Sequence, residues 1–176
     1  MSGRELLVTC GGLGHLRPAP GTWGSLPPVA LAWLMLLDGS SYATYSAVLA
    51  ALCVVFGASC VIFGVWTQHR FGKKDPSQCV SDETCAQCLP LLCWPGAWFE
   101  SCRLSSLDQF GHSREFWHAT ASVTAAFLLF RVLDILKPWP GRRLEGLPYG
   151  FGVLADDLSS GLYAAIVLQA AIWMYF

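Results

Sequence analysis

One uncharged apolar run constrains this chain more than any other feature. The stretch ATYSAVLAALCVVFGASCVIFGVW occupies residues 43–66 and contains no charged side chain. At 1.5 Å per residue, a helix of this length exceeds the ~30 Å hydrocarbon layer of a bilayer. Small residues recur along it and favour close approach of neighbouring helices: Ala43, Ala47, Ala51, Gly57 and Gly64. The run therefore predicts a membrane-spanning helix.

Two further segments reach span length. Residues 158–176 end in aromatic side chains, as an interfacial belt would place them, and residues 116–136 carry Arg131 and Asp134 near their end. Hydrophobic residues make up 54% of the 176 residues and charged residues only 13%, whereas a soluble domain carries about 25% charged residues. The first residues lack the pattern of a signal peptide, so we expect insertion through these internal segments.

Segments 26–37 and 84–99 are apolar as well, but each is too short to cross comfortably or contains a proline. We expect hairpin or half-embedded helices there. Residues 1–176 are thus expected to form a single all-α domain. It would be a compact multi-helix integral membrane protein, with about five helices and three clear spans.

Basic residues predict the orientation of these helices. Two basic motifs flank the spans, RFGKK at Arg70, Lys73 and Lys74 and KPWPGRR at Lys137, Arg142 and Arg143, and basic loops lie on the cytoplasmic side. If each short helix also makes one pass, residues 10–25, 67–83 and 137–157 emerge together on that side. The polar motifs would then converge there, and residues 100–115 would form a solvated outer loop.

The acidic residues next to the apolar segments come in two adjacent pairs. Asp82–Glu83 and Asp156–Asp157 each stand at the N-terminal edge of an expected helix. A single carboxylate there is explained by helix capping and by the helix dipole. Two doubled sets at the edge of a bilayer repel one another and are costly to desolvate. Because Mg²⁺ binds hard oxygen ligands and would remove that repulsion, all four residues are also candidate metal ligands.

The segment FRVLDILKPWP supplies cations near these carboxylates. Arg131, Asp134 and Lys137 follow at three-residue steps, which places them within roughly 60° of one another on a helix. One interpretation is a structural ion pair, since Asp134 can neutralise either neighbour. The other is a phosphate clamp made by Arg131 and Lys137, because an ionisable group within a membrane helix is a functional-site candidate and arginine binds phosphate through two N–H groups.

The Gly- and Pro-rich stretch GGLGHLRPAPGTWGSLPP at 11–28 precedes an apolar segment. Its spacing matches neither common nucleotide-binding glycine motif. Ser25 is expected to cap a helix whose first turn contains Pro27 and Pro28. The loop before it is interpreted either as a rigid turn or as an anion-binding loop, and His15 as a loop histidine.

The cysteines are a weaker signal, although the chain has eight of them. Cys53 and Cys60 lie inside the longest apolar run and are expected to be small core residues. A zinc site built from two CxxC pairs is not favoured, because only Cys85–Cys88 has that spacing. No basic tract indicates nucleic-acid binding.

Four blocks in this order resemble the phosphatidylglycerophosphatase A family: GLGHLRPAPGTWGSL, DPSQCVSDETCAQ, FRVLDILKPWP and GFGVLADDLSSG. With the apolar segments between them they cover most of the chain. This chain departs from the family pattern at Ala86, where a glycine is usual, at Cys88, where tryptophan is usual, at Ser160 in the last block and at Gly141, where isoleucine is frequent. No carboxylate is lost at these positions.

The resemblance implies a small helical membrane enzyme that hydrolyses the phosphomonoester of phosphatidylglycerophosphate to phosphatidylglycerol and phosphate with Mg²⁺. It implies catalytic roles for Asp82, Glu83 and Asp157, and metal binding by these three with Asp156. It also implies phosphate binding by Arg131 and Lys137 and supporting roles for the remaining motif residues Asp134, Thr22 and Ser25. The expected location is the bacterial inner membrane, with the site on the cytoplasmic side.

Two questions stay open at this stage. The attacking group is either a water molecule activated by the metal or an aspartate that forms a covalent phosphoenzyme. The alternative to an enzyme is a lipid-binding or assembly protein of the membrane, in which the carboxylates are caps and the Arg–Asp–Lys face is structural.

Overall fold

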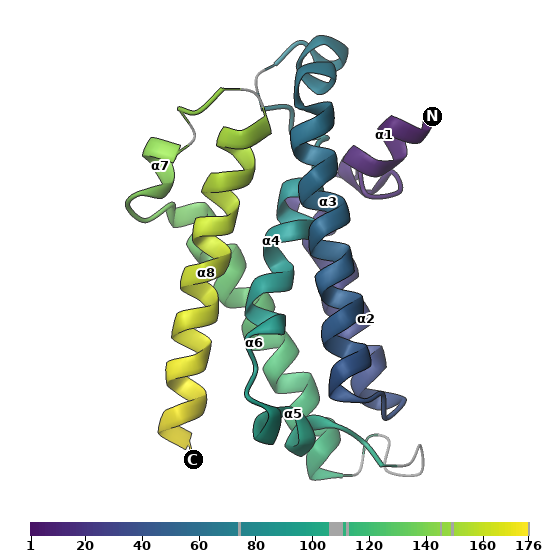
Figure 1. Ribbon diagram of the computed structural model, residues 1–176, viewed down its shortest axis with the longest axis vertical. Helices are drawn as coiled ribbons and strands as arrows, with labels where there is room; N and C mark the ends of the chain where they lie inside the picture. Colours follow the sequence, from purple (N-terminus) through teal and green to yellow (C-terminus); the bar gives the residue numbers. More distant parts are fainter. Residues whose placement is uncertain (74, 106–110, 112, 145, 149, 176) are drawn as a thin grey trace.

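The computed structural model of the chain describes residues 1–73, 75–105, 111, 113–144, 146–148 and 150–175. Its helices are α1 (Gly3–Val8), η1 (Leu13–His15, a 3-10 helix), α2 (Pro20–Leu37), α3 (Tyr42–Phe71), α4 (Ser81–Leu92), α5 (Gly96–Cys102), α6 (Arg114–Leu136), α7 (Gly141–Leu144) and α8 (Gly150–Tyr175) (Figure 1). The described residues contain no strand, so the all-α prediction is confirmed. The expected number of five helices is wrong: the described residues form eight α-helices, because short helices also form in the connections.

Three of the helices are long and apolar enough to cross a membrane, and they are the three expected spans. They are α3, α6 and α8. The start of α8 differs from the prediction, since it begins at Gly150 and not near residue 158. The acidic pair interrupts the apolar run in the sequence, but the helix continues through it because Asp156 and Asp157 point to the protein interior, where both are buried.

Helix α2 also begins earlier than predicted. Pro20 occupies its first turn, where a proline is well tolerated, and Ser25 is not the N-cap. The Ser25 hydroxyl instead donates to the Gly21 carbonyl 2.8 Å away, one turn back in the same helix. Pro27 and Pro28 therefore lie inside the helix.

The prolines of α2 create a contact with α4. Pro28 has no N–H to donate to the Gly24 carbonyl, which a helical residue at that position would normally do. The Thr84 hydroxyl of α4 lies 2.7 Å from that carbonyl oxygen and can donate to it. A Cβ at Gly24 would collide with the Val80 side chain. The two helices thus approach closely at the Gly24 carbonyl, which Pro28 leaves without a hydrogen-bond donor from its own helix.

Helix α4 occupies the centre of the bundle and packs against α2, α3, α6 and α8 (Figure 1). Nine of its 12 residues are buried. Glycines permit the close packing, because a Cβ at Gly57 would lie 3.0 Å from the Cys85 sulfur and one at Gly161 would lie 2.6 Å from the Ala86 carbonyl oxygen. The alanines Ala43, Ala47 and Ala51 of α3 are exposed, so only the glycine part of the predicted contact face is used.

The segment 84–99, expected as one piece, is split between α4 and α5 at Cys93–Pro95. Below this break an aromatic and aliphatic cluster fills the core. The Tyr45 ring packs at a tilt against Trp94 and Phe99, at ring-centroid distances of 6.1 and 5.0 Å. This apolar core lies toward the end of the molecule that carries α5 and the C-terminus (Figure 1).

The opposite end gathers the polar segments, as predicted. Helix α1, the end of α3, α7 and the start of α8 lie there (Figure 1), and α1 packs on α3 while α7 packs on α8. Lys74 of the first basic motif, and residues 106–110 and 112 of the expected outer loop, lie outside the described residues.

Candidate active site

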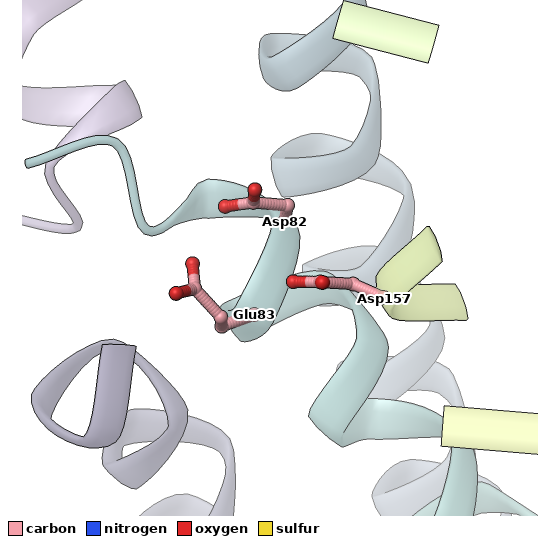
Figure 2. Close-up of side chains that lie close together, drawn as sticks. All are labelled: Asp82, Glu83 and Asp157. Carbon is pink, nitrogen blue, oxygen red and sulfur yellow. The ribbon is translucent and has the colours of Figure 1, made fainter. Parts of the chain in front are cut away.

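Three carboxylates from two helices meet inside the polar half of the bundle. The first turn of α4 carries Asp82 and Glu83, and α8 contributes Asp157 from its third turn. One carboxylate oxygen from each of the three residues lies within 4.8 Å of those from the other two (Figure 2). Asp82 is 2% exposed and Asp157 6% exposed, and Glu83 is half-buried. The sequence prediction that the two acidic pairs meet is therefore confirmed for these three residues.

Asp156 is placed differently from its neighbour. Successive residues of a helix point about 100° apart, so the two aspartates cannot face the same point. The Asp156 carboxylate forms an ion pair with the Lys137 ammonium group and is not a member of the close cluster. It still lines the same cavity, on the side where α6 ends.

Helix capping does not explain the acidic pairs. The N-cap of α4 is Val80, which has no side-chain acceptor, and Asp156 and Asp157 lie inside α8. Asp82 and Glu83 do stand in the first turn of α4, where the helix dipole favours negative charge. The dipole therefore contributes at one pair only.

The cluster borders a cavity of about 170 Å³ at the polar end of the bundle. Its walls are almost entirely charged: Asp75, Asp82, Glu83, Asp134, Lys137, Val153, Asp156 and Asp157. Sequence reasoning gave Asp75 no role and missed its position on the cavity wall. Its distance from the other carboxylates in sequence gave no signal of this role.

The cluster is electrostatically unsatisfied within the protein. Burial raises the pKa of Asp82 to about 6. Burial also raises the pKa of Glu83 well above its usual value, and the adjacent negative charge of Asp82 adds to this effect. Asp82 Oδ1 and Glu83 Oε2 are buried and have no hydrogen-bond partner among the described residues. Three convergent carboxylates, two of which have an unpartnered buried oxygen, fit a hard divalent cation such as Mg²⁺.

Arg131 and Lys137 flank the carboxylates from α6, but each already pairs with an acid. Arg131 Nη1 lies 3.0 Å from Asp134 Oδ2 and donates to the Ser25 hydroxyl at 3.4 Å. Lys137 is the C-cap of α6, has a left-handed backbone conformation and contacts Asp156. The structural ion pair considered from the sequence is therefore present between Arg131 and Asp134.

The N-terminal turn of α2 packs against Glu83 of the cluster and against Arg131. A Cβ on Gly21 would collide with Glu83 Oε1 and lie 3.2 Å from both terminal guanidinium nitrogens of Arg131. Ser25 supports Arg131 directly, whereas the half-buried Thr22 side chain has no hydrogen bond among the described residues. The structure gives no reason for the supporting role predicted for Thr22.

Sequence reasoning also missed Gln87. Its side chain is fully buried one turn after Glu83, and neither amide atom has a partner among the described residues. A glutamine within an otherwise apolar helical segment was the available signal. All eight cysteines are free thiols, and none joins the cluster of Asp82, Glu83 and Asp157 found among the described residues.

Fold and site together define an all-helical membrane protein with a carboxylate-lined cavity at one end. The family model of phosphatidylglycerophosphatase A matches residues 6–172. The chain therefore belongs to the phosphatidylglycerophosphatase A family. The family is one of phosphatases, so the protein is an enzyme, and the non-enzymatic alternative is not supported.

Individual relatives are similar to this chain over most of their length. A phosphatidylglycerophosphatase A of Haemophilus influenzae is 33% identical, over 97% of this chain and 90% of the relative. A candidate phosphatidylinositol-3-phosphatase of Bacteroides thetaiotaomicron is 31% identical, over 96% and 93%. A phosphatidylglycerophosphatase A of Escherichia coli is 28% identical, over 93% and 80%. No solved structure matches this chain.

Proposed function

We propose that this protein is a Mg²⁺-dependent lipid phosphatase that hydrolyses the phosphomonoester of phosphatidylglycerophosphate to phosphatidylglycerol and phosphate. Family membership and the names of two relatives support the substrate. The observation that carries the proposal is the carboxylate cluster of Asp82, Glu83 and Asp157, whose oxygens lie within 4.8 Å of one another in a polar cavity.

These three residues would hold the metal. Mg²⁺ bound there would supply positive charge against the phosphoryl oxygens and lower the pKa of a water molecule. Asp156 lines the same cavity but pairs with Lys137, so its proposed share is indirect: it orients the ammonium group. The water and phosphoenzyme routes are both compatible with three carboxylates at one point.

The two basic residues of α6 would bind the phosphoryl group. Phosphoryl transfer spreads negative charge over the oxygens of the transferring group, and catalysis consists mainly of positioning and charge stabilisation. Lysine has three N–H donors and arginine five, so the carboxylates that Lys137 and Arg131 contact leave donors for phosphate oxygens. Asp134 and Ser25 hold the Arg131 guanidinium in place.

The location proposed for this reaction is the cytoplasmic side of the bacterial inner membrane. Three apolar helices support membrane insertion. The basic residues Arg70, Lys73 and Arg142 occur at the same end as the cavity, and positive charge favours the cytoplasmic side. A lipid headgroup at that surface could reach the cavity without leaving the bilayer.

Phosphate release from purified protein tests the proposal. With phosphatidylglycerophosphate in mixed micelles, we expect release in the presence of Mg²⁺ and none after EDTA treatment, with recovery when Mg²⁺ is restored. Phosphatidylinositol 3-phosphate should be assayed in parallel, because the Bacteroides relative carries that substrate in its name. No release from phosphatidylglycerophosphate under any metal condition would contradict the proposed activity.

The metal-binding role is tested by Asp157→Asn. This variant keeps the size of the side chain but removes one charged ligand, so we expect activity to fall by roughly 100-fold or more. Asp38→Asn is the matched control, because Asp38 is exposed and its carboxylate accepts hydrogen bonds from the neighbouring Ser40, far from the carboxylate cluster in the sequence. Full activity in folded Asp157→Asn would refute the proposed metal site.

A further inference from the structure

A second polar cavity of about 120 Å³ lies at the same end of the bundle. The loop before α2 and the segment before α4 form its walls, from Gly14, His15, Arg17, Pro20, Ser77 and Gln78. The side chains of this set offer a guanidinium, an imidazole, a hydroxyl and an amide, and no carboxylate. Such a lining donates hydrogen bonds and favours an anion, whereas the acidic cavity favours a cation.

In two short stretches of chain, neighbouring residues belong to the two different cavities or their surroundings. Asp75 lines the acidic cavity, and Ser77 and Gln78 line the second one. In the other wall Pro20 lines the second cavity, while the next residue, Gly21, contacts Glu83 and Arg131. The loop and the segment pack directly together, since a Cβ on Gly14 would collide with the Gln78 carbonyl. The two cavities are therefore lined by neighbouring residues of the same two segments.

The charge of Arg17 is not neutralised within the protein. Its side chain is exposed, and it has no carboxylate partner among the described residues. Glu5, which contacts the cavity residue His15, lies 3.8 Å from His15 Nε2 and 3.9 Å from Arg70 Nη2. Arg131 and Lys137, by contrast, each contact an aspartate. The second cavity thus presents a cation without a carboxylate partner among the described residues, whereas Lys137 on the wall of the acidic cavity pairs with Asp156.

We propose that this second cavity binds the phosphodiester group of the substrate, with Arg17 as its main charged contact. The inference rests on the proposed function, because phosphatidylglycerophosphate carries a phosphomonoester and a phosphodiester that are separated by one glycerol unit. With the monoester at Asp82, Glu83 and Asp157, the diester falls in the neighbouring cavity. Arginine suits this role, since its planar fork donates two parallel hydrogen bonds to phosphate oxygens. The site would select lipids with two phosphates over those with one.

Binding of dihexanoyl phosphatidylglycerol to the full-length protein tests this assignment directly. This probe carries the diester and no monoester, and calorimetric titration measures its Kd without turnover. In Arg17→Gln we expect the Kd to rise about tenfold, the effect of losing one charge-assisted hydrogen bond. Arg17→Lys keeps the charge without the fork and should give a smaller rise. Arg142→Gln is the control, because Arg142 is exposed on α7 and lines neither cavity.

Enzyme kinetics distinguish whether the anion bound in the second cavity is the phosphodiester of the substrate or free inorganic phosphate. In Arg17→Gln the KM for phosphatidylglycerophosphate should rise with kcat nearly unchanged, as expected for a contact made equally in the ground and transition states. Inhibition by inorganic phosphate should be unaffected. An unchanged Kd for the diester probe in Arg17→Gln would overturn the proposal, as would equal weakening of inhibition by inorganic phosphate. Arg17-dependent binding of the diester in a protein without phosphatase activity would support this cavity and refute the proposed function.

Discussion

Gly21 is the residue at which three helices of the site come together. Its missing side chain leaves the space in which α2 approaches Glu83 of α4 and Arg131 of α6. The glycine-rich stretch was interpreted from the sequence as a rigid turn or an anion loop. The structure gives this glycine a third role, because it lies inside a helix and serves close packing without needing unusual backbone angles.

Gly21→Ala should separate activity from stability. Alanine favours a helix over glycine by about 0.5–1 kcal/mol, so α2 itself should tolerate the change. The new Cβ would displace Glu83 Oε1 or the Arg131 guanidinium, and misplacing a catalytic group by about 1 Å can cost roughly 100-fold in rate. We expect a large loss of phosphate release with a nearly unchanged melting temperature in detergent.

Gly3→Ala is the matched control for this variant, since a Cβ there meets no atom within 4 Å. It should leave both activity and melting temperature at the wild-type values. Equal activity in Gly21→Ala and Gly3→Ala would show that the close contact at Gly21 is unimportant for the reaction.

Residue identity predicted the carboxylates of the site but not their partners. Asp156 and Asp157 are equivalent in the sequence, and only the rotation of α8 decides that Asp157 faces Asp82 while Asp156 faces Lys137. The same limit applies to Asp75 and Gln87. Each reaches the site or its surroundings through tertiary packing, which leaves no periodic pattern in the chain.

At the scale of the elements, the length of the apolar runs predicted the membrane-spanning helices correctly, whereas the starts of two helices were predicted wrongly. The spans α3, α6 and α8 follow from uninterrupted hydrophobicity. The start of α2 was misplaced because Ser25, followed by Pro27 and Pro28, resembles a capped helix start. The start of α8 was misplaced because the acidic pair resembles a helix boundary. In both cases a neighbouring helix compensates for the polar or proline residue, as Thr84 does for the Gly24 carbonyl.

An ion pair links the end of α6 to α8. Lys137→Met would leave the Asp156 carboxylate, which is 1% exposed, without its cation. Removing one partner of a buried pair costs about 3–5 kcal/mol, and we expect the lower end of that range because Lys137 is 30% exposed. The apparent melting temperature in detergent should fall accordingly.

A second substitution distinguishes lost charge pairing from lost packing. Adding Asp156→Asn to Lys137→Met removes the uncompensated charge and should recover most of the melting temperature. Lys73→Met, at an exposed position, should have no effect. If Lys137→Met melts like the wild type, the pair contributes nothing to the junction.

At the scale of the whole molecule, polar and apolar halves are segregated along the bundle. The two polar cavities lie toward the end with α1 and α7, and the aromatic cluster around Tyr45 lies toward the other end. This separation was predictable from the order of spans and basic motifs. The sequence did not predict how deeply the polar residues of α4 lie in the bundle, because this segment has the pattern of a short apolar helix.

Cysteine labelling tests the orientation that follows from this segregation. With Cys93, the exposed native cysteine, replaced by alanine, single cysteines can be introduced at Lys73 and at Ser41, the exposed residues near opposite ends of α3. In intact cells whose outer membrane is permeable to the reagent, a membrane-impermeant maleimide should label Ser41→Cys. Lys73→Cys should react only after the inner membrane is opened. The reverse pattern would place the active site on the outer side.

The central position of α4 has a consequence for biogenesis. At 12 residues and 1.5 Å per residue this helix is about 18 Å long, too short to cross a bilayer alone. Its acidic first turn would also resist transfer into lipid. Because α2, α3, α6 and α8 all contact it, the helix must wait for C-terminal segments that are synthesised later before its surroundings are complete. The translocon would thus release an active enzyme only after α8 has emerged, and the acidic site would be the last part of the molecule to assemble.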